Sequence, residues 1–132
     1  MEGCPEDMTH DISILRFLRG HGNDVNEAAE YMQQALQYRM NVIASNPAVK
    51  DMRASLAKAT AIEMHKLPFA DEMLKIIPLC AASGHTRTGL PVMVLAPKLV
   101  DYDAIASIAD SDKLATFFAA HLEQRSIVLH NL

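Results

Sequence analysis

Apolar residues recur every three or four positions through the first half of the chain, and this spacing predicts α-helices. The most regular run begins after Asp24, a favourable helix N-cap, with Glu27 three residues later in a capping-box arrangement. Its apolar positions are Val25, Ala28, Ala29, Met32, Ala35, Leu36, Met40 and Ile43. We expect this helix to end near Ser45 and Asn46, because Pro47 disfavours helical backbone in the residue before it.

Shorter helices are expected on either side of this run. The first covers residues 12–19, with Thr9 or Asp11 as its N-cap, and the glycines and asparagine of residues 20–23 are expected to end it. Helical patterns also cover residues 48–65 and 69–76. The sequence therefore predicts a compact helical bundle in this half of the chain.

Two further helices are predicted near the C-terminal end of the sequence. Asp101 is expected to cap a short helix over residues 102–108, and a long final helix is expected to begin at residues 110–112. One face of the final helix is predicted to carry Leu114, Phe117, Phe118, His121, Leu122, Arg125 and Leu129.

The pattern changes after Ile77. Two apolar runs, residues 78–82 and 90–96, flank a polar loop bounded by glycines at residues 83–89. Such an arrangement predicts a β-hairpin or an adjacent pair of strands. Pro91 and Pro97 bracket the second run and limit the strand to its central residues.

Composition and charge narrow the classes of protein. The chain has 132 residues, enough for one domain or two small lobes, and half of them are apolar. A net charge of −4 argues against a nucleic-acid-binding protein, which needs an excess of positive charge. No apolar stretch is long enough for a transmembrane helix. Residues 1–8 are expected to form a flexible lead-in rather than a secretory signal.

No motif in the sequence calls for catalysis, a cofactor or a metal ion. The spacing of Gly84 and Gly89 matches a phosphate-binding loop, but Leu90 and Pro91 stand where lysine and serine or threonine are needed. The six histidines include no pair spaced one helical turn apart. We therefore expect a protein that is not an enzyme. Its two cysteines are interpreted as reduced thiols of a cytoplasmic protein.

Eight methionines, together with Phe117 and Phe118, leave two interpretations open. Methionine is flexible and polarisable, so it fills irregular apolar cores and also lines adaptable binding surfaces. The residues are therefore either ordinary core or the wall of a cavity for a hydrophobic ligand.

Two separate blocks of the sequence resemble the CRAL-TRIO family. The first is ILRFLRGHGNDV at residues 14–25, continued by two alanines at 28–29 and by LQYR at residues 36–39. It is similar to the family's N-terminal helical region. The second is Gly84-x-x-x-x-Gly89-Leu90-Pro91-Val92, which is similar to the turn before a strand of the family's lipid-binding lobe. The resemblance covers residues 11–129.

The resemblance implies a mostly α fold with a small β element. A helical lobe at residues 9–66 would precede the first part of an α/β lipid-binding lobe at residues 67–132, and the C-terminal half of that lobe is not in the sequence. The implied function is non-enzymatic binding or transfer of a lipid or other small hydrophobic molecule, with possible peripheral membrane contact. The candidate lipid-binding residues are Val92, Val94, Phe117 and Leu122. The alternative is a protein-interaction or regulatory module without lipid carriage.

Local departures from the family pattern argue against recognition of phosphoinositides. His21 and Gly22 occupy the positions of a basic pair that phosphatidylinositol-binding members carry, and Thr86 and Leu90 replace charged residues of the turn.

A sheet limited to two strands leaves an edge unpaired. We therefore expect a homo-oligomer formed through the exposed sheet edge at residues 92–95 and the helix at residues 114–129.

Overall fold

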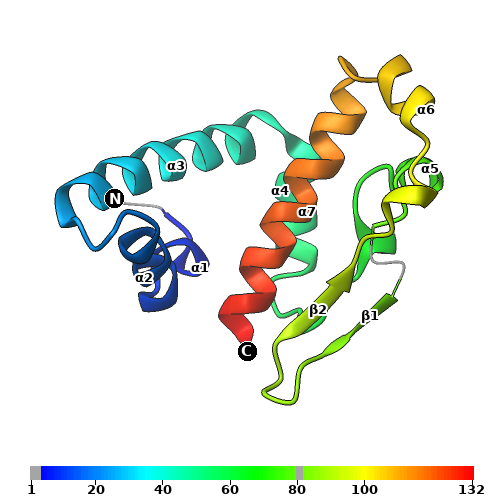
Figure 1. Ribbon diagram of the computed structural model, residues 1–132. Coiled ribbons are helices and arrows are strands. Elements are labelled where there is room, and N and C mark those ends of the chain that lie inside the picture. The colour runs from blue at the N-terminus through cyan, green and yellow to red at the C-terminus, as the bar shows by residue number, and fades with distance from the viewer. Residues whose placement is uncertain (1–3, 80–81) are drawn as a thin grey trace. The chain divides into compact units, whose positions relative to one another are not determined.

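The computed structural model describes residues 4–79 and 82–132 (Figure 1). It is mostly helical with one small two-stranded sheet, which confirms the predicted fold class. The chain divides into two compact units, Met1–Pro47 and Ala48–Leu132. The predicted lobe boundary after residue 66 therefore lies inside the second unit. Each unit is described by itself below.

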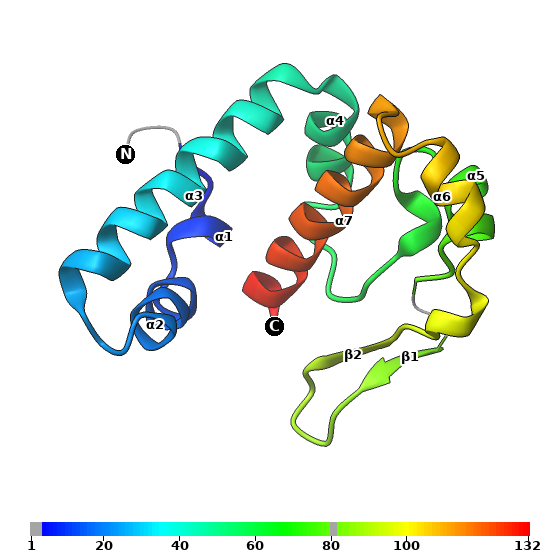
Figure 2. The same cartoon turned by 45° about the horizontal axis from the view of Figure 1, so that its top comes forward.

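Among its described residues, the first unit contains three helices: α1 (Glu6–Thr9), α2 (Asp11–Gly20) and α3 (Val25–Ser45). Helix α2 packs against α3, as both views show (Figures 1 and 2). The turn between them contains Gly22 and Asn23 with φ values of 60° and 67°. Glycine and asparagine tolerate this left-handed backbone better than other residues, so the predicted helix stop is confirmed.

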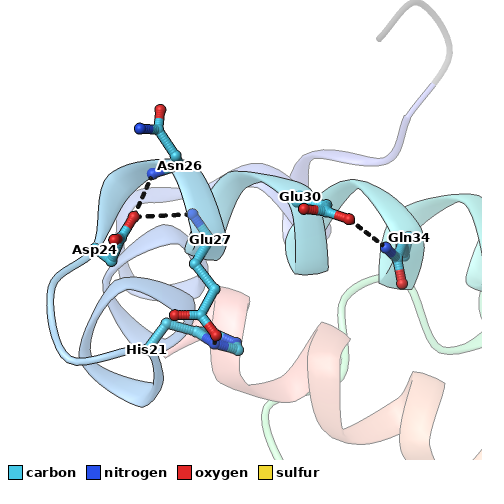
Figure 3. A network of polar contacts seen from close by, with 6 residues as sticks. All are labelled: His21, Asp24, Asn26, Glu27, Glu30 and Gln34. Atoms are coloured by element: carbon cyan, nitrogen blue, oxygen red, sulfur yellow. Dashed lines mark hydrogen bonds and ion pairs between the residues drawn. The ribbon is translucent and has the colours of Figure 1, made fainter.

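Helix α3 begins as the sequence predicts. One oxygen of the Asp24 side chain accepts hydrogen bonds from the backbone N–H groups of Asn26 and Glu27, at 2.9 and 3.0 Å (Figure 3). These bonds satisfy two of the donors that a helix leaves free at its N-terminus. The helix ends at Ser45, and Asn46 donates its backbone N–H to the Val42 carbonyl.

Residues 6–9 differ from the flexible lead-in predicted for residues 1–8, of which residues 1–3 lie outside the described part of the chain. Residues 6–9 form the single turn α1, the Met8 side chain is buried, and Asp7 lies 3.6 Å from Arg39 as an ion pair. A single turn has no periodicity that a sequence pattern could reveal. The N-cap of α2 is His10, without a side-chain hydrogen bond, rather than the predicted Thr9 or Asp11.

The second unit is organised around α4 (Pro47–Ser55), α5 (Ala70–Ile76) and α7 (Asp112–Asn131). Their apolar side chains form one core. Its buried members include Val49, Met52, Leu56, Leu67, Met73, Ile77, Phe117, Ala120, Ile127 and Val128. A short 3-10 helix, η1 (Met64–Lys66), adds the buried Met64.

The helix predicted over residues 48–65 is shorter than expected, because α4 ends at Ser55. Beyond this point the Asn131 side chain of α7 donates hydrogen bonds to the carbonyls of Ala57 and Ala59, at 3.0 and 2.9 Å. A contact between residues more than seventy positions apart thus replaces the helical bonds that local periodicity predicts.

Helix α7 begins at the predicted place, with Ser111 as its N-cap, and α6 (Tyr102–Ser107) is capped by Asp101 as expected. The predicted face of α7 is wrong, however. The buried residues are Thr116, Phe117, Ala120, His121, Glu123, Gln124, Ile127 and Val128. Only Phe117 and His121 belong to both sets. The buried face includes Glu123 because it forms an ion pair with Arg53 of α4.

The predicted hairpin is confirmed, but its first strand is displaced: it lies mostly in the predicted loop at residues 83–89 rather than in the apolar run at residues 78–82, of which residues 80 and 81 lie outside the described part of the chain. Strand β1 (Ala82–His85) pairs antiparallel with β2 (Pro91–Val94), with Gly84 opposite Val92. The Thr86 hydroxyl accepts hydrogen bonds from the backbone of Thr88 and Leu90, so the polar loop is closed by its own side chain. A second 3-10 helix, η2 (Pro97–Leu99), follows β2.

Phe69 has a φ of 61°, the left-handed conformation, immediately before α5. This backbone is costly for a bulky residue, so we expect Phe69→Asn to raise the free energy of unfolding by about 1 kcal/mol. Phe69→Leu is the control, because it removes the ring over which the Lys113 ammonium lies at 5.8 Å and keeps the unfavourable backbone. In denaturant unfolding, the free energy of unfolding should be higher for the Asn variant than for wild type, and for the Leu variant it should equal or fall below the wild-type value. The reverse order would contradict the proposed backbone strain at Phe69.

Candidate functional site

The first unit contains an apolar pocket of about 320 Å³ between α2 and α3. Helix α2 contributes residues at i, i+3 and i+4, and α3 contributes residues at i, i+3, i+4 and i+7, so each helix presents one stripe to the pocket. The lining residues are Thr9, Ile14, Phe17, Leu18, Val25, Ala28, Ala29 and Met32.

The chemistry of this lining is almost entirely apolar, and the Thr9 hydroxyl is the one polar side-chain group among the lining residues. Two consecutive alanines, Ala28 and Ala29, leave space opposite the larger side chains of α2. At the rim, Ile14 and Val25 remain 46% and 69% exposed. The pocket is therefore a groove that admits an apolar molecule from solvent.

A second hollow of about 300 Å³ is lined by Arg16, Phe17, Gly20 and His21, and it shares Phe17 with the first. The His21 ring stacks on Tyr31, with 4.5 Å between ring centroids. The Nδ1 atom of His21 lies 3.5 Å from the Glu27 carboxylate (Figure 3). These contacts hold His21 at the end of α2. The Phe17 side chain thus separates the apolar pocket from the more polar hollow at the end of α2.

The four residues predicted from the sequence to bind lipid lie in different settings. Val92 and Val94 are 39% and 45% exposed on the hairpin, Phe117 is fully buried, and Leu122 is 59% exposed. Phe117 and Leu122 are five positions apart on α7, which turns their side chains about 140° away from each other. They therefore lie on different faces of that helix.

Sequence reasoning missed the pocket residues of α2 and α3 as a site, although it identified both stripes. A signal was present in the small residues Ala28 and Ala29, which stand among larger apolar residues in the stripe of α3. Small residues opposite a neighbouring helix leave either close packing or a void, and periodicity alone does not distinguish these.

Within residues 4–79 and 82–132, no group of three or more histidine, cysteine, aspartate or glutamate side chains is placed to hold a metal ion. In the same part of the chain, none of the helices has the combination of length and apolar composition that crossing a bilayer requires.

His121 is buried on α7, and its Nδ1 atom has no hydrogen-bond partner among the described residues. Burial lowers the pKa of His121 below its ordinary value of 6.5, and the positive charge of Arg125 lowers it further. The unfolded chain therefore binds this proton more tightly than the folded chain does. The resulting contribution to stability is complete above pH 6.5 and decreases as the pH falls from there toward the lowered pKa.

We accordingly expect His121→Gln to lose less of its thermal stability than wild type when the pH is lowered from about 7.5 to 5.5. His85→Gln, at an exposed position of the hairpin, is the control and should follow wild type. Thermal unfolding at several pH values measures the difference. Parallel pH profiles for wild type and His121→Gln would show that this histidine does not cause the acid sensitivity.

Comparison with known proteins finds no matching family model, no matching curated protein and no matching solved structure.

Proposed function

We propose that this chain binds a lipid or another small hydrophobic molecule without converting it, as part of a CRAL-TRIO-like protein. The observation that supports this function is the apolar pocket between α2 and α3. The proposal thus moves the binding site from Val92, Val94, Phe117 and Leu122 to the helical unit. In this proposal the chain acts in the cytoplasm, where it transfers the hydrophobic molecule between membranes through transient peripheral contact with them.

The pocket volume limits the ligand that the proposal allows. Small-molecule sites span about 300–1,000 Å³, so this pocket, at about 320 Å³, belongs at the lower end. One acyl segment or a compact ring system suits such a space better than a complete two-chain lipid. Each methylene group buried there contributes about 0.8 kcal/mol, which is enough for reversible binding without any polar anchor.

A protein-interaction module is the second candidate, and two exposed tyrosines of α3 favour it. Tyr31 and Tyr38 are 49% and 71% exposed, and tyrosine is enriched at protein interfaces. This function does not require the pocket between α2 and α3 to stay open. Narrowing the pocket therefore distinguishes the two candidates.

The test uses N-phenyl-1-naphthylamine, an uncharged probe whose fluorescence rises in apolar surroundings, and the full chain. Ala28→Leu places a larger side chain in the pocket, and we expect it to weaken probe binding at least about tenfold, the equivalent of nearly two methylene groups of burial. Ala44→Leu makes the same change at an exposed position of α3 outside the pocket lining and should bind like wild type.

Circular dichroism is the control and should show that both variants keep the helical content of wild type. Absence of saturable probe binding to wild type, or equal binding by the two variants, would contradict ligand binding in this pocket and would favour the interaction module.

A further inference from the structure

The β-hairpin of the second unit, labelled β1 and β2 in Figure 1, carries exposed aliphatic side chains along β2 and just before it. Leu90, Val92 and Val94 are 52%, 39% and 45% exposed, and the spacing of two residues places them on the same face of the strand. Leu95 and Leu99, which follow β2, are also about half exposed. A row of aliphatic groups at the surface marks an interaction site more often than an isolated one does.

The outer edge of β2 is poorly suited to pairing with another strand. Thr86 donates its backbone N–H to the Leu90 carbonyl at 2.8 Å, so the hydrogen-bonded pairs of the ladder continue at Val92 and Val94. The backbone groups of Pro91 and Met93 then face the open edge. Because proline has no N–H, one of the donors that strand addition needs is missing there. The exposed aliphatic face of the hairpin, rather than the edge of β2, is therefore the surface suited to a partner.

The segment that contains the hairpin carries positive charge, whereas the whole chain has a negative net charge. The sequence carries 16 acidic residues and a net charge of −4, yet residues 73–100 contain no aspartate or glutamate. The same segment carries Lys75, Arg87 and Lys98. Arg87, in the hairpin loop, and Lys98, just after β2, are exposed and form no ion pair with other residues in the described part of the chain.

We propose that the hairpin stripe, defined as Leu90, Val92 and Val94, together with Arg87 and Lys98, docks on the surface of an anionic lipid bilayer. The aliphatic side chains enter the boundary between head groups and acyl chains, and the two cations lie beside the lipid phosphates and carboxylates. This surface does not depend on the pocket of the first unit.

Charge complementarity selects a lipid surface as the partner. Anionic leaflets attract basic residues held near them, and each lysine or arginine strengthens membrane partitioning about fivefold. A row of aliphatic groups without aromatic or hydrogen-bonding side chains suits a fluid apolar phase, which needs no shape complementarity. The attraction is screened over about 10 Å at 0.1 M salt, so binding should weaken as salt is added.

Flotation of the full chain with vesicles tests this proposal. We expect binding to vesicles of phosphatidylcholine mixed with phosphatidylserine and much weaker binding to phosphatidylcholine alone. Arg87→Glu with Lys98→Glu should weaken the binding at least about 25-fold, because two attractions of about fivefold each are lost. Lys50→Glu with Lys58→Glu changes the net charge by the same amount at exposed sites elsewhere in the unit, and should retain most of the binding.

The apolar contribution has its own pair of variants. Val92→Ser with Val94→Ser should also weaken binding, whereas Leu122→Ser, at an exposed leucine of α7, should not. Arg87→Gln with Lys98→Gln gives a milder charge change if the Glu variants unfold.

Three results would overturn the proposal: no dependence of binding on phosphatidylserine, equal losses from the two charge reversals, or no effect of the serine substitutions in the hairpin. Light scattering that shows a dimer dissociated by the hairpin substitutions would also overturn it, because a second copy would then cover the stripe.

Discussion

Glu123→Gln is expected to lower the free energy of unfolding by about 3–5 kcal/mol, because it removes the carboxylate charge of a largely buried ion pair with Arg53. Only 5% of the Glu123 side chain and 12% of the Arg53 side chain are exposed. The pair joins α4 to α7, two helices of the second unit that Figure 2 labels, and little water reaches its charges. Urea unfolding measures the loss.

The matched control is Glu72→Gln, which removes the partner of Lys113 from an ion pair of 2.8 Å whose side chains are about half exposed. Solvent screens this pair, so the expected loss is at most about 1 kcal/mol. Similar losses from the two substitutions would mean that the Arg53–Glu123 pair is hydrated in solution and does not hold α4 and α7 together.

Phe117→Ala is expected to cost about 3–5 kcal/mol of unfolding free energy, because it removes a fully buried aromatic ring and leaves a cavity. The sequence offered Phe117 as a wall of a ligand cavity. In the structure it lies in the core of the second unit, with its ring 5.9 Å from that of Phe118 in an edge-to-face arrangement. Its main expected role is therefore stability.

Phe118→Ala is the neighbouring control. Its ring is 37% exposed, so the same truncation removes less buried surface and should cost clearly less. Calorimetry on both variants, with and without the naphthylamine probe, separates the roles of Phe117. If Phe117→Ala lost little stability but lost probe binding, Phe117 would belong to the ligand site, and its assignment to the core would be wrong.

The elements that the sequence predicted well are those with local causes. Helix α3 follows from an unbroken apolar period, and its start follows from Asp24, whose side chain reaches donors only two and three residues away. Strand β2 follows from the apolar run at residues 90–96, whereas β1 lies mostly in the residues predicted as the loop. These interactions depend on neighbours in the sequence, so a pattern records them.

The features that the sequence did not predict depend on distant partners. The end of α4 depends on Asn131, and the buried face of α7 depends on Arg53, which compensates the charge of Glu123. The pocket between α2 and α3 depends on how closely two helices approach, a distance that no periodicity contains. The sequence accordingly predicts lipid-binding residues in the hairpin and α7 rather than beside Ala28.

Methyl resonances of methionine provide the most direct test of where a hydrophobic ligand binds. Met32 lines the pocket between α2 and α3, Met93 lies in β2 between Val92 and Val94, and Met73 is buried in the core of the second unit. In protein labelled with ¹³C at the methionine methyl groups, titration with the naphthylamine probe should shift the Met32 signal and leave those of Met93 and Met73 in place. Shifts at Met93 with none at Met32 would contradict a pocket in the helical unit and would return the site to the hairpin.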